Sequence, residues 1–233
     1  MSCNRGQVIH WHLYPTAESL WESAARAVSR AAAQAIAGKG AFRLVLAGGN
    51  TPRSAYEQLR QRGTDWHGWH IYFGDERCVP TDDPERNSRM AFDAWLDHVD
   101  IPPGQIHPIP AELGPETAAA AYAEVLRPVD EFDLVLLGLG PDGHTASLFP
   151  GQTWGDTPEA PGVLAVHGAP KPPPDRVSLS AQRLSAAQQV LFLVTGPDKK
   201  QVIHRWRAGE AIPACAIAPR SGVDVMVELP AFE

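Results

Sequence analysis

The sequence lacks long apolar runs and contains few cysteines. No window of its 233 residues approaches the roughly 18 to 20 uninterrupted apolar residues of a membrane-spanning helix, so we expect no membrane partner. Cys3, Cys78 and Cys215 are widely separated and odd in number. That pattern favours reduced thiols over a disulfide framework or a zinc site. Residues 1–15 also lack the basic start and apolar core of a secretion signal, and these absences together predict a cytoplasmic protein.

An excess of positive charge is missing as well. Lysine and arginine number 20 against 27 aspartates and glutamates, which leaves a formal net charge of −7. Because a nucleic-acid-binding protein usually carries a basic face, we expect no nucleic-acid partner. A small anionic substrate is still compatible with this balance, since a few arginines and backbone N–H groups can create a local positive field.

Apolar segments that alternate with helical patterns make up most of the chain. Apolar runs predict strands at residues 42–46, 69–73, 132–140, 162–168, 176–180 and 188–196. Helical spacing and helix-start signals predict helices at residues 16–37, 52–60, 87–99, 115–126 and 197–209, and residues 212–229 read as two short strands. Apolar strands that alternate with helices indicate a parallel sheet covered on both faces. The sequence therefore predicts a single α/β domain over residues 1–233, with a mostly parallel sheet and helices on both faces.

Three of the predicted strands end in polar, glycine-containing loops. These loops are AGGNTP at residues 47–52, GDERCVP at 74–80 and GLGPDGH at 138–144. In open α/β sheets, ligands bind beyond the carboxyl ends of the strands. If the three strands are neighbours, their loops form one crevice, and the sequence predicts a binding site there.

The first loop combines a strand end, two glycines and a helix start. Gly48 and Gly49 allow a close approach of the backbone to a ligand, and Asn50 and Thr51 add polar groups. The helix predicted from Pro52 points the positive end of its dipole back at the loop, which makes an anion-binding cup. Neither the Walker signature nor the dinucleotide fingerprint is present. A merely tight turn between strand and helix is the alternative interpretation.

The second loop places Asp75, Glu76 and Arg77 in succession. A guanidinium is always charged and can grip a phosphate or a carboxylate at two points, so Arg77 is a candidate ligand for an anion. The alternative is a solvated charged turn with an internal ion pair. Asn87 and Ser88 follow at a predicted helix start, where capping is as good an explanation as ligand contact.

The third loop carries a histidine two residues after an aspartate. The unperturbed pKa of histidine, near ~6.5, suits a proton acceptor at neutral pH. Asp142 could fix the tautomer of His144 or stabilise its protonated form, which is the usual arrangement in acid–base sites. Since two side chains at this spacing can also point apart, a solvated or structural histidine is the alternative.

Other polar residues give weaker or negative signals. Lys199 and Lys200 begin a helix, where the dipole disfavours a cation, and this suggests that one of them serves an anionic ligand. The paired histidines in HWH and WHGWH lack further ligands at metal spacing, so we expect no metal site. Ser147 lacks the G-x-S-x-G elbow of a serine nucleophile.

Five motifs occur in an order and spacing that resemble one enzyme family. They are LAGGNTPRSAYEQL, GDERCVPTDDPERNS, GLGPDGHTASLFPG, KPPPDRVSLS and LVTGPDKKQVI, and they extend over about residues 17–219. Together they are similar to the 6-phosphogluconolactonases, which share a Rossmann-like α/β fold with glucosamine-6-phosphate deaminases. The resemblance implies a metal-independent, cofactor-free hydrolysis of 6-phospho-D-glucono-1,5-lactone in the oxidative pentose phosphate pathway, by a monomer or weak homo-oligomer.

The resemblance also implies roles for individual residues. His144 would be the general base, and Asp142 would orient it. The substrate and its phosphate would be held by Gly48, Gly49, Asn50, Thr51, Asp75, Arg77, Arg176 and Lys199.

A deaminase or sugar-phosphate isomerase of the same fold is the alternative function. The deaminases share the glycine loop and the aspartate–histidine segment but continue with a Phe-Asn-Glu stretch that contains a catalytic glutamate. Here the continuation is TASLF, and no carboxylate follows His144 before Asp156. This difference favours the lactonase.

Overall fold

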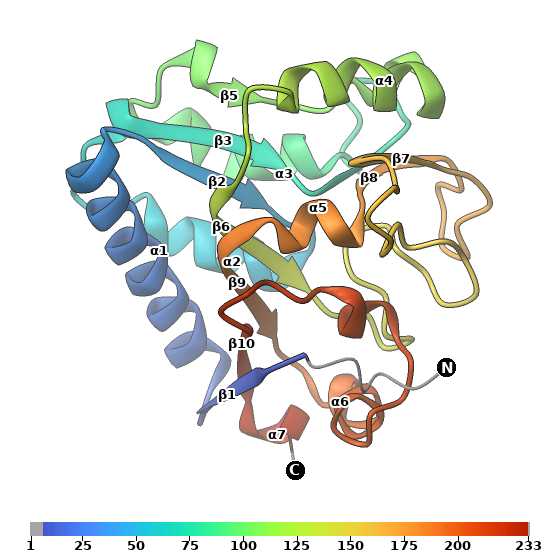
Figure 1. Cartoon of the computed structure of the whole chain (residues 1–233). Helices are drawn as coiled ribbons and strands as arrows, with labels where there is room; N and C mark the ends of the chain where they lie inside the picture. The colour runs from blue at the N-terminus through green and yellow to red at the C-terminus, as the bar shows by residue number, and fades with distance from the viewer. Residues whose placement is uncertain (1–6, 233) are drawn as a thin grey trace.

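A seven-stranded parallel sheet forms the centre of the molecule. The computed structural model describes residues 7–232, and the strands follow the order β1-β10-β9-β6-β2-β3-β5 (Figure 1). Every neighbouring pair is parallel, so the prediction of a mostly parallel sheet is confirmed. The strands are β1 Ile9–Tyr14, β2 Phe42–Leu46, β3 Trp69–Phe73, β5 Ile106–His107, β6 Phe132–Gly138, β9 Ala187–Val194 and β10 Val223–Glu228.

A smaller antiparallel sheet of three strands has the order β4-β8-β7. Its strands are β4 Asp75–Arg77, β8 Arg176–Leu179 and β7 Val163–Val166. The prediction of a charged loop at residues 75–77 is wrong, because Asp75 pairs with Ser178 and Arg77 with Arg176. So short and polar a strand has no apolar pattern of its own, and only its partner, far away in the sequence, makes it a strand.

Helices cover both faces of the large sheet. The helices are α1 Ala17–Lys39, α2 Asn50–Leu59, α3 Asn87–Ala94, α4 Pro115–Leu126, α5 Ala181–Ser185, α6 Lys200–Arg207 and α7 Leu229–Phe232. α1 packs against α2, β2, β6 and β10, and α5 lies on the opposite side of the sheet from α2 (Figure 1). The Thr16 side chain caps α1 by accepting from the Ser19 N–H, and Gly40, at φ 76°, follows the last helical residue, Lys39, two residues beyond the predicted end at residue 37.

The ends of the chain depart most from the prediction. Residues 212–229 contain a 3₁₀ helix, Pro213–Ala216, and one strand, β10, so the expectation of two short strands is wrong. β1 was not predicted, because His10 and His12 interrupt its apolar run. It becomes a strand by pairing with β10 along its whole length, which places it at the edge of the sheet.

The structure also bears on the membrane and cysteine predictions. Within residues 7–232, no helix combines the length and apolar character needed to cross a membrane. Cys78 is a free thiol, and burial raises its pKa to about 11. Cys215 is disulfide-bonded, so the expectation of reduced thiols is wrong there, since separation along the chain does not exclude close approach in the fold. Cys3 lies outside the described residues.

Candidate active site

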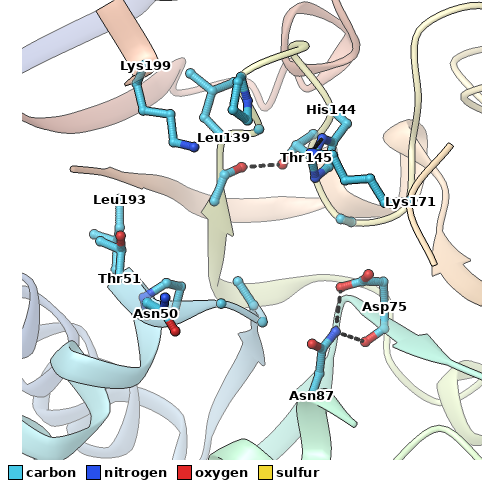
Figure 2. A pocket seen from close by; sticks show the side chains of 18 of the residues that line it. Asn50, Thr51, Asp75, Asn87, Leu139, His144, Thr145, Lys171, Leu193 and Lys199 are labelled. Atoms are coloured by element: carbon cyan, nitrogen blue, oxygen red, sulfur yellow. Dashed lines mark hydrogen bonds between the residues drawn. The ribbon is translucent and has the colours of Figure 1, made fainter. Parts of the chain in front are cut away.

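The three polar segments that follow β2, β3 and β6 meet in one cleft. β6, β2 and β3 are neighbours in the sheet, and because they are parallel their carboxyl ends lie at the same edge (Figure 1). The loops after these strands line a cleft of about 430 Å³ (Figure 2). All the predicted site residues except Asp142 line it. Asp142 lies behind His144, to which it is hydrogen-bonded.

The loop after β2 leads directly into α2 and forms one end of the cleft. Gly49, at φ 102°, turns the chain so that the helix begins at Asn50, two residues earlier than predicted. A Cβ at Gly48 would lie 1.9 Å from the side-chain oxygen of Asn87, so a larger residue there would displace that buried side chain. No side chain caps α2, so the N–H groups of Asn50 and Thr51 are available to an anionic ligand. The Thr51 hydroxyl lies 2.6 Å from that of Thr195.

Lys199 adds a positive charge to this end. Its ammonium lies 2.7 Å from the Asp198 carboxylate, and the side chain lines the cleft. Figure 2 shows Lys199, Asn50 and Thr51 on one side of the cleft, with His144 and Lys171 on the other. The cleft therefore has one end formed by a helix start and a lysine and, across from it, an end with a histidine.

His144 and Asp142 form a hydrogen-bonded pair at the second end. The ring Nδ1 lies 2.5 Å from Asp142 Oδ1. Because an ionised carboxylate can only accept, Nδ1 carries the proton, and Nε2 keeps its lone pair. The ring fits because residue 140 is glycine: a Cβ there would lie 1.9 Å from Nδ1. The Phe149 ring packs against the imidazole with a centroid separation of 5.0 Å.

The surroundings keep this pair in the form that a base requires. Burial lowers the pKa of His144, and the positive charge of Lys171 lowers it further, while Asp142 and Asp75 act in the opposite direction. Burial alone would raise the pKa of Asp142, but the hydrogen bond and charge of His144 and the charge of Lys171 lower it overall. At neutral pH the imidazole is therefore uncharged and the carboxylate ionised.

Asp75 lies on the floor of the cleft and is fully engaged. It is 6% exposed; one carboxylate oxygen accepts from the Ser147 hydroxyl at 2.6 Å and the other from the Asn87 amide at 3.1 Å. Ser147 is thus a buried hydrogen-bond donor to Asp75, and it does not line the cleft.

The other charged residues of β4 divide into a structural and a cleft-lining group. Glu76 is completely buried, and its carboxylate accepts from the N–H groups of Asn87 and Ser88, which fixes the start of α3. Arg77 lines the cleft. Its guanidinium donates to the Glu85 carbonyl, but its buried Nε has no hydrogen-bond partner among the described residues.

Arg176, at the start of β8, holds the loop that carries Lys171. Arg176 is 5% exposed, and its guanidinium donates to the carbonyls of Lys171, Pro172 and Pro173. These three bonds engage Nε and one terminal nitrogen of the guanidinium. The contact of Arg176 with substrate stays a prediction. Lys171 lines the cleft beside His144, and sequence reasoning missed it. The only available signal was its place in the KPPPDRVSLS motif.

The cleft residues include no ready set of metal ligands. Across residues 7–232, no three or more histidine, cysteine, aspartate or glutamate side chains are grouped so that they could hold a metal ion. The polar groups around the cleft are instead an uncapped helix start, a histidine–aspartate pair and several separate cations.

Comparisons with known proteins agree with this geometry. Residues 15–226 match the family described as glucosamine-6-phosphate isomerases/6-phosphogluconolactonase. The 6-phosphogluconolactonase of Synechocystis is 40% identical over 206 residues, 83% of each chain, and that of Mycobacterium leprae is 33% identical over 93% of each chain. The crystal structure of 6-phosphogluconolactonase from Thermotoga maritima superposes with a TM-score of 0.88 at 27% identity, covering 95% of this chain and 100% of that one. The chain therefore belongs to the family of glucosamine-6-phosphate isomerases and 6-phosphogluconolactonases.

Proposed function

We propose that this protein is a lactonase that hydrolyses 6-phospho-D-glucono-1,5-lactone to 6-phosphogluconate in the oxidative pentose phosphate pathway. The observation that carries the proposal is that a histidine, hydrogen-bonded to an aspartate, lies across one cleft from a helix start that no side chain caps. The substrate has the same polarity, with a phosphate at one end and an ester carbonyl at the other. The names of the relatives from Synechocystis and Mycobacterium leprae support the same activity.

His144 acts as the general base. Nε2 takes a proton from a water molecule, whose oxygen attacks the lactone carbonyl carbon. The tetrahedral intermediate then breaks its bond to the ring oxygen, which takes the proton back from the imidazolium. Asp142 holds the ring and stabilises its charged form between these two steps. Positioned proton transfer of this kind typically contributes ~10²- to 10⁴-fold to a rate.

The reaction requires neither a metal nor a covalent nucleophile in this proposal. A δ-lactone is an activated ester, so a positioned water and a base suffice. The phosphate binds to the N–H groups at the start of α2, with the charges of Lys199 and Arg77 beside it. The phosphate contacts fix the distance between the carbonyl carbon and His144, which is how binding energy contributes to catalysis.

The test generates the lactone in situ with glucose-6-phosphate dehydrogenase and follows acid release with and without the protein. We expect release well above the spontaneous rate, unchanged after treatment with a chelator. Release equal to the spontaneous rate contradicts the lactonase, and loss of activity with the chelator contradicts metal independence. Ammonia release from glucosamine 6-phosphate would instead support the deaminase alternative.

A further inference from the structure

A second cation, Lys171, lies at the histidine end of the cleft. Its ammonium is 3.4 Å from His144 Nδ1 and 3.8 Å from Asp142 Oδ1. Since Nδ1 donates its proton to Asp142, it cannot also accept one from Lys171, and the carboxylate lies beyond hydrogen-bond distance. No other contact of this ammonium is present among the described residues. Its N–H donors are therefore free for a ligand in the cleft.

The chain holds this lysine in place through its backbone. Arg176 donates to the carbonyl of Lys171 at 3.1 Å and to that of Pro172 at 3.2 Å, and it is itself buried. Burying a guanidinium is costly unless it is hydrogen-bonded, and here Nε and one terminal nitrogen donate to the segment that carries Lys171. The lysine side chain is 45% exposed, so its base is fixed while its charged tip can follow a ligand.

The reaction creates negative charge at the lactone carbonyl, and a cation at the histidine end of the cleft would stabilise it. Attack by water turns the uncharged lactone carbonyl into an oxyanion, and ring opening then yields a carboxylate on the same carbon. Both charges form beside His144, across the cleft from Lys199 and the start of α2 (Figure 2). Of the charged groups that face His144, Asp142 and Asp75 are negative and would repel such an anion.

We propose that Lys171 is a catalytic residue that binds the oxygen of the reacting carbonyl through its ammonium, first as the oxyanion and then as the product carboxylate. This inference rests on the proposed lactonase function and adds a residue to it. The substrate is thereby held between two cationic ends, with Lys199 near the phosphate and Lys171 at the carbonyl carbon.

Two ligands distinguish a contact between Lys171 and the carboxylate from a general effect of Lys171 on ligand binding. 6-Phosphogluconate carries a phosphate and a carboxylate, whereas glucitol 6-phosphate carries the same phosphate and a hydroxyl in place of the carboxylate. We expect Lys171→Met to raise the Kd of 6-phosphogluconate about 10- to 100-fold, as for a lost hydrogen bond to a charged group. The Kd of glucitol 6-phosphate should stay unchanged, and kcat, measured on the pH plateau, should fall by a similar factor. Lys171→Arg should recover part of both losses.

Lys200→Met is the matched control, because Lys200 is exposed and does not line the cleft. It should match the wild type with both ligands. If Lys171→Met binds 6-phosphogluconate as the wild type does, or loses both ligands equally, the role of Lys171 is overturned while the lactonase stands. A wild-type protein that neither hydrolyses the lactone nor binds either ligand overturns the proposed function, and this inference with it.

Discussion

The large and the small sheet differ in the share of polar residues that they bury. In β6, at the centre of the large sheet, five of seven residues are buried and apolar. The small sheet buries Asp75 and Glu76 in β4, and Arg176 and Ser178 in β8. Each of these buried polar groups is hydrogen-bonded, as burial in a low-dielectric environment requires.

This difference means that the two sheets contribute differently to the stability of the fold and to the charge of the cleft. Apolar burial in the large sheet stabilises the fold and places three loops around one cleft, but it supplies no charge. The small sheet contributes less apolar area and instead supplies the oriented charged groups around that cleft. A change in the large sheet should therefore alter stability alone, a change in a loop should alter chemistry alone, and a change in the small sheet should alter both.

The largest expected effect is on chemistry alone. His144→Ala should lower kcat by ~10²- to 10⁴-fold, because it removes the base. The midpoint of thermal unfolding should stay close to that of the wild type. His204→Ala, an exposed histidine of α6, is the control and should keep full activity. A kcat near the wild-type value for His144→Ala would contradict the assignment of the base.

The second effect is on stability alone. Phe42 is completely buried in β2, with its ring 4.9 Å from that of Trp69. Phe42→Ala should lower the free energy of unfolding by about 3–5 kcal/mol through lost burial and the cavity left behind. The kcat/KM of the folded fraction should not change. Chemical denaturation measures the free energy of unfolding, with the exposed Leu13→Ala as control. A lower kcat/KM in the folded fraction would contradict the claim that the large sheet affects stability alone.

The third change should couple the two properties. Glu76→Gln replaces a buried carboxylate that accepts from the N–H groups of Asn87 and Ser88 and lies 3.5 Å from Arg86. We expect a loss of about 1.5–3 kcal/mol of stability together with a higher KM, because Asn87 lines the cleft. The exposed Glu22→Gln serves as control. If only one of the two quantities changes, the small sheet does not have its double role.

The smallest effect is a shift in a pH profile. Burial lowers the pKa of His144, so the basic form persists below the ordinary value of ~6.5 and is lost only as the pH falls further. The acid limb of kcat/KM, which reports the free enzyme, should therefore lie below that value. Because Asp142 raises the pKa of His144, Asp142→Asn should move the limb to still lower pH. A limb above ~6.5 in the wild type would contradict the burial of the base.

The same division explains what the sequence could predict. Strands such as β2 and β6, and helix α4, carry their own apolar pattern, so their bounds were predicted closely. β1 and β4 were missed, because each becomes a strand only through pairing with a distant segment.

Within the site, glycines and strand ends predicted the cleft and its two ends. The sequence could not show that the Arg176 guanidinium would donate to the Lys171 carbonyl, or that the Lys171 side chain would lie beside His144. Both contacts depend on how the small sheet packs against the large one, and no local pattern records that. Ser147 was judged only as a nucleophile, whereas its contact with Asp75 comes from segments far apart in the sequence.

The central claim is that the anion cup and His144 serve opposite ends of one molecule. A crystal structure of the wild-type protein with 6-phosphogluconate tests it most directly. We predict the phosphate on the N–H groups of Asn50 and Thr51, and the carboxylate beside His144 and Lys171. A phosphate bound at the His144 end, or a ligand outside this cleft, would contradict the account.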